Sequence, residues 1–175
     1  MHPRCPHYAE RRSRHKWVNV LETLYFSLVA PLISYGIEVW YGAPDYLRNR
    51  MNIMQKRAVR AIHSLPYSAH TKTYFKNMKL LNITDQYKLN SSIQFYKNLT
   101  INNINMTFLK NSHNHSYSTR SNDQISIPLY NRSKSQKSFK FMAVTIWNSI
   151  PPNIRESPNI VDFKRKLKTH LLSSY

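Results

Sequence analysis

An apolar segment from Asn19 to Trp40 constrains the fold of this chain most. Residues 17–41 contain no Lys or Arg and two acidic residues, Glu22 and Glu38. Apolar side chains lie on nearly every side of a helical projection, which is typical of a helix enclosed by protein. The apolar run from Thr23 to Ile37 is shorter than the ~20 residues that a membrane span needs. We therefore predict a buried helix and no membrane contact.

Two residues inside this segment disturb a regular helix. Pro31 lacks an amide hydrogen, so it should kink the helix near its middle. Gly36 should loosen the last turn, because glycine tolerates backbone angles outside the helical range.

The most basic part of the chain follows directly, since residues 42–79 carry eight basic residues and one acidic residue. A helix is predicted from about Pro44 to Ser64. At about 100° per residue, one arc of this helix is apolar and should face the core. The opposite arc carries Lys56, Arg57 and Arg60, with Arg50 at its flank. The apolar arc consists of Leu47, Met51, Met54, Ala58, Ala61 and Ile62.

The remaining patterns predict a mostly α-helical protein in four parts. Residues 1–16 read as a basic unstructured lead, 17–99 as a helical domain, 100–124 as an Asn- and Ser-rich loop, and 125–175 as a small α+β terminal unit. In the second part, a short helix should run from Thr71 to Lys79. A longer one should begin at Thr84 or Asp85 and end near Leu99. Its buried side is predicted to carry Ile93, Tyr96 and Leu99.

In the terminal unit, the alternation of Ile125, Ile127 and Leu129 predicts a short strand interrupted by Pro128. A helix should follow over residues 138–149 and stop at Pro151 and Pro152. The last helix should start near Asn159 or Asp162 and run through Leu171.

The sequence argues against metal and cofactor chemistry. The four aspartates, at positions 45, 85, 123 and 162, are never adjacent, so the paired carboxylates of a two-metal site are not expected. Cys5 is the single cysteine, and with His2, His7 and His15 it matches no compact zinc finger. The pair His113 and His115 is interpreted as incidental. Gly36 and Gly42 are the two glycines, which excludes a glycine-rich phosphate loop. We expect no catalytic residue, cofactor or small-molecule substrate.

The net charge of +18 indicates a polyanionic partner. Lys and Arg contact phosphates without sequence-specific geometry, so the basic helix faces are candidates for binding a nucleic-acid backbone. The alternative is that these faces are merely solvated and the nearby tyrosines merely core. The candidate residues are Arg50, Lys56, Arg57, Arg60, Lys164, Arg165 and Lys168, and the candidate stacking groups are Tyr41, Tyr46, Tyr67, Tyr74 and His70. Without an apolar leader in the first seven residues, we expect an intracellular protein.

Three motifs, in order, resemble reverse transcriptases of non-LTR retrotransposons. The segment LYFSLVAPLISYGIEVW (Leu24–Trp40) is similar to the part that follows the catalytic palm, and MQKRAVRAI (Met54–Ile62) to the basic helix after it. Thr119–Ser121, Phe139–Pro151 and Asn159–Leu171 are similar to the carboxy-terminal end. The likeness covers roughly residues 24–172.

The resemblance implies that residues 17–99 form a thumb-like helical bundle that grips a primer–template duplex. It also implies partner palm and fingers domains, with the Mg²⁺ of polymerisation held in the palm. That palm carries an Asp-Asp motif that this chain lacks, so we expect an inactive fragment that still binds nucleic acid. Three alternatives remain: an enzyme completed by separately encoded domains, a repurposed protein-interaction module, or a non-functional pseudogene product.

Overall fold

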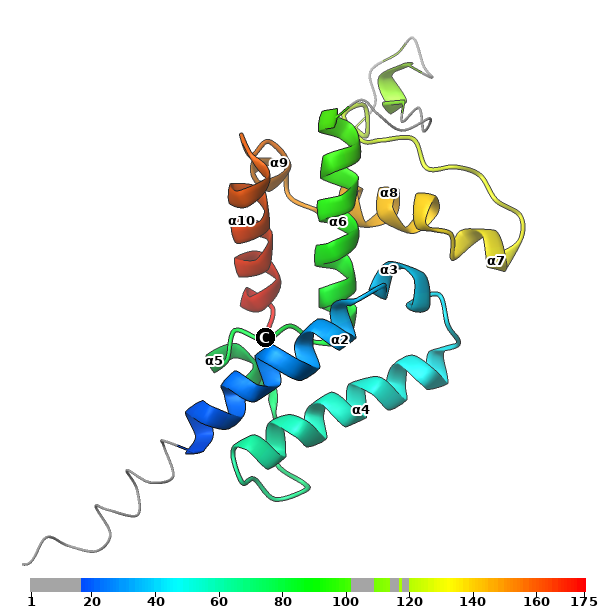
Figure 1. Cartoon of the computed structure of the whole chain (residues 1–175). Coiled ribbons are helices and arrows are strands. Elements are labelled where there is room, and N and C mark those ends of the chain that lie inside the picture. The colour runs from blue at the N-terminus through cyan, green and yellow to red at the C-terminus, as the bar shows by residue number, and fades with distance from the viewer. Residues whose placement is uncertain (1–16, 102–108, 114–116, 118–119) are drawn as a thin grey trace, which may run out of the picture.

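The computed structural model describes residues 17–101, 109–113, 117 and 120–175. This part of the chain is mostly α-helical, as predicted (Figure 1). The predicted basic lead, with its four zinc candidates before residue 16, lies outside the described residues. So do residues 102–108, 114–116 and 118–119 of the predicted Asn-rich loop, which include His115 and Thr119.

The apolar segment forms one helix, Trp17–Ser34, that changes its hydrogen-bonding pattern before Pro31. Residues 17–24 are α-helical, Tyr25–Val29 form a π-helical turn (η1), and Ala30–Ser34 form α2. The amide of Ala30 donates to the carbonyl of Tyr25, five residues back. This wider turn accommodates Pro31, whose ring would clash with the preceding turn of a regular α-helix. The disturbance predicted at Pro31 thus takes the form of a π turn.

The helix ends at Ser34, earlier than the predicted Trp40. Tyr35 has an extended backbone and Gly36 adopts a left-handed conformation with φ of 61°. A short separate helix, α3 (Ile37–Trp40), follows. Gly36 therefore breaks the helix instead of loosening its last turn, because glycine adopts a positive φ without the steric cost of a side chain.

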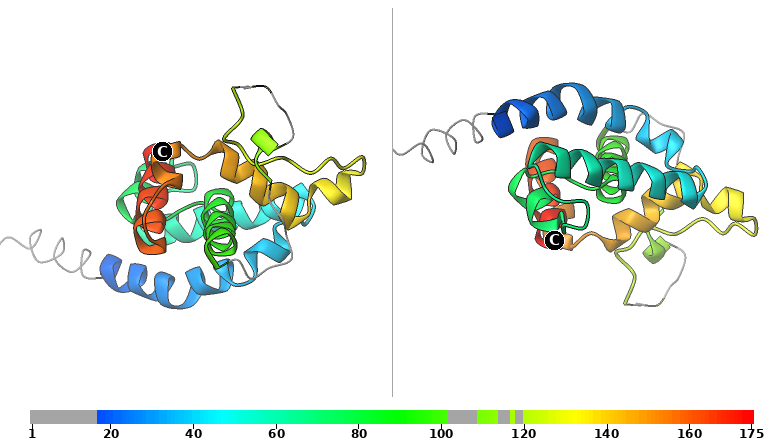
Figure 2. Two further views of the ribbon diagram at one scale, coloured as in Figure 1. Left: turned by 90° about the horizontal axis from the view of Figure 1, so that it is seen from above. Right: turned by 90° about the horizontal axis from the view of Figure 1, so that it is seen from below.

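The prediction of a buried helix is wrong for the part of the protein that the structure describes. Only 6% of the residues in Trp17–Ser34 are buried, and Leu32 is 77% exposed. Both views in Figure 2 place this helix along the outer edge of the molecule, beside α4. By length and composition alone it is apolar enough to cross a membrane, a test that a core helix of a soluble protein also passes. The composition of a helix shows that its surface is apolar. It does not show whether another element of the chain packs against that surface.

Helix α4 (Asp45–Ile62) has nearly the predicted bounds, but it buries a different face. Its buried side chains are Gln55, Val59 and Ile62, whereas Leu47 and Met54 are exposed. Gln55 is buried because its amide donates to the carbonyl of Leu81 at 3.0 Å and to the hydroxyl of Tyr25 at 3.3 Å. A helical projection of hydrophobic residues does not place a polar side chain such as Gln55 on the core face. Of the predicted apolar arc, only Ile62 is buried and only Met51 and Ala58 are half-buried.

Helix α6 (Ile83–Ile101) follows the short α5 (Lys72–Asn77) and lies at the centre of the fold. Its cap is Asn82, whose side-chain oxygen accepts from the amide of Asp85 at 2.8 Å, and neither Thr84 nor Asp85 as predicted. The predicted buried side is also wrong in part, since Leu99 is exposed and Phe95 is fully buried. Helices α2, α3, α4, α8 and α10 all pack against α6, so no single face of it is the core face.

The carboxy-terminal region begins with η2 (Asn111–His113) and α7 (Ser133–Gln136), and the predicted helices follow as α8 (Phe139–Ser149) and α10 (Ile160–Ser173). A short α9 (Pro152–Arg155) lies between them, after the predicted stop. Asn159 caps α10 by accepting from the amide of Asp162 at 2.8 Å. The predicted strand is not confirmed, because the described residues show one isolated antiparallel bridge, between Lys110 and Ile125.

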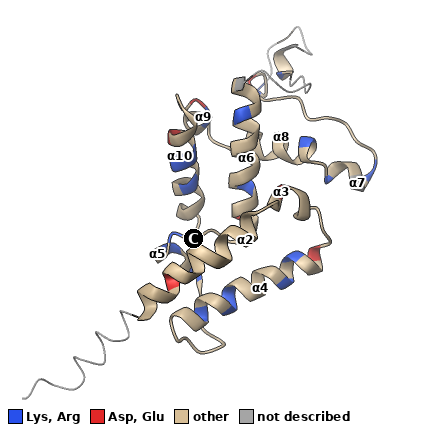
Figure 3. Cartoon of the chain, viewed as in Figure 1, with Lys and Arg blue, Asp and Glu red and all other residues tan. Residues whose placement is uncertain are grey.

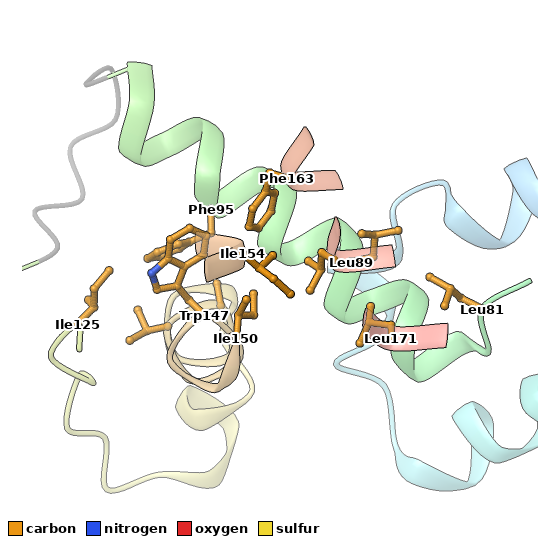
Figure 4. Packing of buried hydrophobic residues seen from close by; sticks show 12 residues of the cluster. Leu81, Leu89, Phe95, Ile125, Trp147, Ile150, Ile154, Phe163 and Leu171 are labelled. Carbon is orange, nitrogen blue, oxygen red and sulfur yellow. The ribbon is translucent and has the colours of Figure 1, made fainter. Parts of the chain in front are cut away.

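The largest core cluster lies between α6, α8 and α10 (Figure 4). The Phe163 ring stacks on the Tyr96 ring, with 4.7 Å between the ring centroids, and its centroid lies 5.6 Å from that of Trp147. The ring centroids of Phe95 and Trp147 are 5.1 Å apart. This cluster takes residues from both the 17–99 and the 125–175 parts, so these two parts share a core. Their division near residue 99 stays a prediction.

Candidate nucleic-acid interface

Helix α4 presents the predicted cations on one side. Lys56 and Arg57 are exposed and Arg60 is half-buried. Figure 3 shows basic residues along α4 and a second group on α10. Arg50 is also exposed, but it borders an apolar hollow with Trp40 and Met54. Arg50 is therefore set apart from the other three.

The loop after α4 is held against these cations. The Arg60 guanidinium Nε donates to the carbonyl of Ala69 at 3.0 Å, and the amide of Leu65 donates to the carbonyl of Arg60 at 2.8 Å. The guanidinium carbons of Arg57 and Arg60 lie 5.9 and 5.7 Å from the centroid of the Tyr67 ring. These contacts are within the range of cation–π attraction.

On α10 the predicted cations differ in how far they are compensated. Arg165 and Lys166 contact the Asp162 carboxylate at 2.5 and 2.8 Å. Hydrogen bonds from Lys166 and then Arg165 hold the pKa of this carboxyl below its usual value. The charge of Arg165 is thus partly neutralised within its own helix.

Lys168 is in the opposite situation. Burial lowers the pKa of its amino group, and the positive charges of Lys164 and Lys79 lower it further. A bound anion would relieve this mutual repulsion between three amino groups.

Helix α5 joins the two cationic groups, a link that the sequence does not reveal. A hollow of about 350 Å³ lies between α4, α5 and the end of α10, with Lys56, His70 and Lys72 in its lining. The positive charges of Lys79, just beyond α5, and of Lys164 on α10 both act on the amino group of Lys168. Lys72 and Lys79 belong to the basic stretch of the sequence, but only the packing of α5 brings them beside α10.

The same hollow contains one carboxylate that is internally satisfied. Asp85 accepts hydrogen bonds from Asn82, Lys88 and the Tyr175 hydroxyl, the last at 3.0 Å. The Tyr175 hydroxyl in turn accepts from the amide of Asn82 at 2.8 Å. Burial is the main reason why the pKa of Tyr175 is raised above its ordinary value. These bonds tie the last residue to the start of α6.

The predicted stacking groups separate into two kinds. Tyr41 stacks on Tyr87 at 3.8 Å, and Tyr74 packs on His63 at 4.6 Å, so both rings serve the fold. Tyr46, Tyr67 and His70 remain exposed and available to a partner.

The residues in the described ranges do not fit a catalytic metal. No group of three or more His, Cys, Asp or Glu residues there could hold an ion. Asp45 is paired with Arg48, Asp162 with Arg165 and Lys166, and Asp85 with Lys88. Mg²⁺ of the kind that a polymerase palm holds has no pair of carboxylates to bind here.

Comparison with known proteins gives one informative match. Over 69 residues the chain is 33% identical to a probable RNA-directed DNA polymerase from transposon BS of Drosophila melanogaster. The match covers 39% of this chain and 8% of that polymerase, so the chain corresponds to a small part of its length. No family profile and no solved structure matches. Part of this chain is therefore similar in sequence to a probable RNA-directed DNA polymerase of a transposon.

Proposed function

We propose that this chain is the thumb and post-thumb part of a non-LTR retrotransposon reverse transcriptase, that it lacks the catalytic palm, and that it binds the primer–template duplex. The partial identity to a transposon polymerase supports the parent family. The three ordered motifs within residues 24–172 support the thumb assignment. On its own, the chain has no polymerase activity in this proposal.

One observation supports the binding part of the proposal. Basic residues in and just after α5 lie between the cations of α4 and those of α10. We name this the basic surface and define it as Lys56, Arg57, Arg60, Lys72, Lys79, Lys164 and Lys168. Lysine and arginine side chains in such an arrangement neutralise successive phosphates and release their counterions. Binding by this surface should be tight at low salt and indifferent to sequence.

A salt titration with a labelled RNA–DNA duplex tests the proposal. Replacing Lys56, Arg57 and Arg60 by Glu should weaken binding across all sequences. The slope of log affinity against log salt should become shallower, by about one unit for each phosphate that the variant no longer neutralises. A triple variant that is indistinguishable from the parent chain would show that α4 does not lie along the duplex.

A single exchange provides the matched control. Lys56→Glu and Lys97→Glu make the same change of charge at exposed positions on long helices. Lys97 lies toward the carboxyl end of α6, a helix that contributes none of the residues of the basic surface. Only Lys56→Glu should lower affinity; equal losses would mean that net charge alone governs binding.

The exposed apolar helix supports a second part of the proposal. Leu28, Leu32 and Val39 lie in the segment that resembles the part following the palm, and all three are exposed. We assign this face to packing against the palm of the parent polymerase, which is consistent with a chain that spans 8% of its relative.

The same face favours one alternative, a repurposed protein-interaction module. Such a module needs the apolar face but no basic surface. Measurement of duplex affinity at moderate salt separates the two functions, because an interaction module would show none.

A further inference from the structure

Tyr67 is an aromatic residue of the candidate interface and lies in the loop between α4 and α5. Its side chain is 75% exposed, although it lies beside two charged groups of α4. An exposed tyrosine alone is common on protein surfaces. The position of this ring is instead fixed by the loop around it.

Two backbone features and one side-chain hydrogen bond hold the loop in one shape. Ser64 has a left-handed backbone with φ of 51°, which ends α4 sharply. The amide of Ala69 donates to the carbonyl of Pro66 at 3.0 Å and closes a tight turn with Tyr67 inside it. Arg60 then fastens this turn to α4 through the Ala69 carbonyl. The ring is thus presented at a tight turn before any partner arrives, which lowers the entropic cost of binding.

The surroundings of the ring define what it can bind. The guanidinium carbons of Arg57 and Arg60 lie over the Tyr67 ring, 5.9 and 5.7 Å from its centroid. The side chain is still 75% exposed, so a flat group that stacks on the open part of the ring lies next to positive charge. A nucleobase has flat π faces, and the sugar that carries it in a strand is linked to a phosphate on each side. Aromatic rings among cations therefore suit an unpaired nucleotide of any sequence.

Resting on the proposed function, we infer that Tyr67 is a stacking platform for an unpaired base, with Arg57 and Arg60 holding its flanking phosphates. Bases inside a duplex already stack on one another and offer no free face to the ring. The nucleic acid at this end of α4 is therefore single-stranded, as in an overhang beside the duplex that the basic surface holds.

Fluorescence anisotropy with two labelled probes tests this inference on the full chain. One probe is an oligothymidylate of about 12 nucleotides, within the site size of single-strand binders. The other is a blunt RNA–DNA duplex. Tyr67→Ala should weaken oligothymidylate binding about fivefold or more, as expected for the loss of one stacked base, and leave duplex binding unchanged. Tyr67→Phe, which keeps the ring, should bind both probes like the parent.

Tyr35→Ala is the matched control. Tyr35 is 85% exposed and lies between α2 and α3, outside the basic surface, so its loss should affect neither probe. Equal weakening on both probes by Tyr67→Ala would overturn the inference, because it indicates damage to the loop. No weakening on either probe would overturn it too.

The outcomes separate the two claims. If Tyr67→Ala changes nothing while the Glu triple variant loses duplex affinity, the inference fails and the proposed function stands. If the parent chain binds neither probe at low salt, both fail.

Discussion

Single polar residues decide where several helices begin and how they pack. Asn82 and Asn159 cap α6 and α10 through their side-chain oxygens, and Gln55 fixes α4 against Tyr25 and Leu81. Asn159 was predicted because an asparagine before an amphipathic run is a strong local signal. Gln55 could not be predicted, because its partners come from elements far along the chain.

Phe163 is a fully buried residue of the largest core cluster. Its ring packs on Tyr96 and Trp147. Phe163→Ala should lower the free energy of unfolding by about 3–5 kcal/mol, from lost burial and the cavity left behind. Urea denaturation followed by circular dichroism measures this change.

Two variants bracket that result. Phe163→Leu keeps most of the volume and should cost about 1.5 kcal/mol or less. Val161→Ala, at an exposed position of the same helix, should change stability by about 0.5 kcal/mol at most. A loss below about 1 kcal/mol for Phe163→Ala would mean that this core does not form as described.

At the scale of elements, the bounds of the long helices followed from the sequence better than the buried faces of α4 and α6 did. Prolines, glycines and caps act on their immediate neighbours, so α4, α8 and α10 begin and end close to the predicted residues. Faces depend on which elements arrive from elsewhere. For this reason α4 buries Gln55 and Val59 while Met54 stays exposed, and α6 is surrounded by helices on several sides.

The helix Trp17–Ser34 was predicted to be buried but is mostly exposed, and this exposure yields a prediction about association. Leu32→Ser should change the free energy of unfolding by about 0.5 kcal/mol at most, because the side chain is 77% exposed. The same change removes part of a large apolar surface and should reduce self-association. Thermal unfolding and sedimentation velocity measure the two effects.

Tyr25→Ala is the internal comparison on the same helix. Tyr25 is buried and hydrogen-bonded to Gln55, so its loss should destabilise the fold clearly. If Leu32→Ser proved as destabilising as Tyr25→Ala, Leu32 would be buried in the folded protein. This result would contradict the exposed position of the helix Trp17–Ser34.

At the scale of the whole molecule, the fold as well as the sequence decides which of the cations behind the net charge of +18 lie close together. The sequence identifies Lys56, Arg57 and Arg60 as one face because they lie within two turns of one helix. It does not reveal that the charge of Lys79 acts on Lys168, because these two residues are far apart along the chain. The ion pair of Asp162 with Arg165 could have been predicted, because the two residues lie three positions apart on one helix.

The central claim is that the basic surface holds nucleic acid, and photo-crosslinking tests it most directly. An RNA–DNA hybrid with a photoreactive uridine and a short overhang is irradiated with the chain, and crosslinked peptides are identified by mass spectrometry. The account predicts crosslinks in α4, in residues 63–70, in α5 and in α10, lost in the variant with Glu at positions 56, 57 and 60. Crosslinks confined to the helix Trp17–Ser34 or to α8, or no crosslinks at low salt, would contradict it.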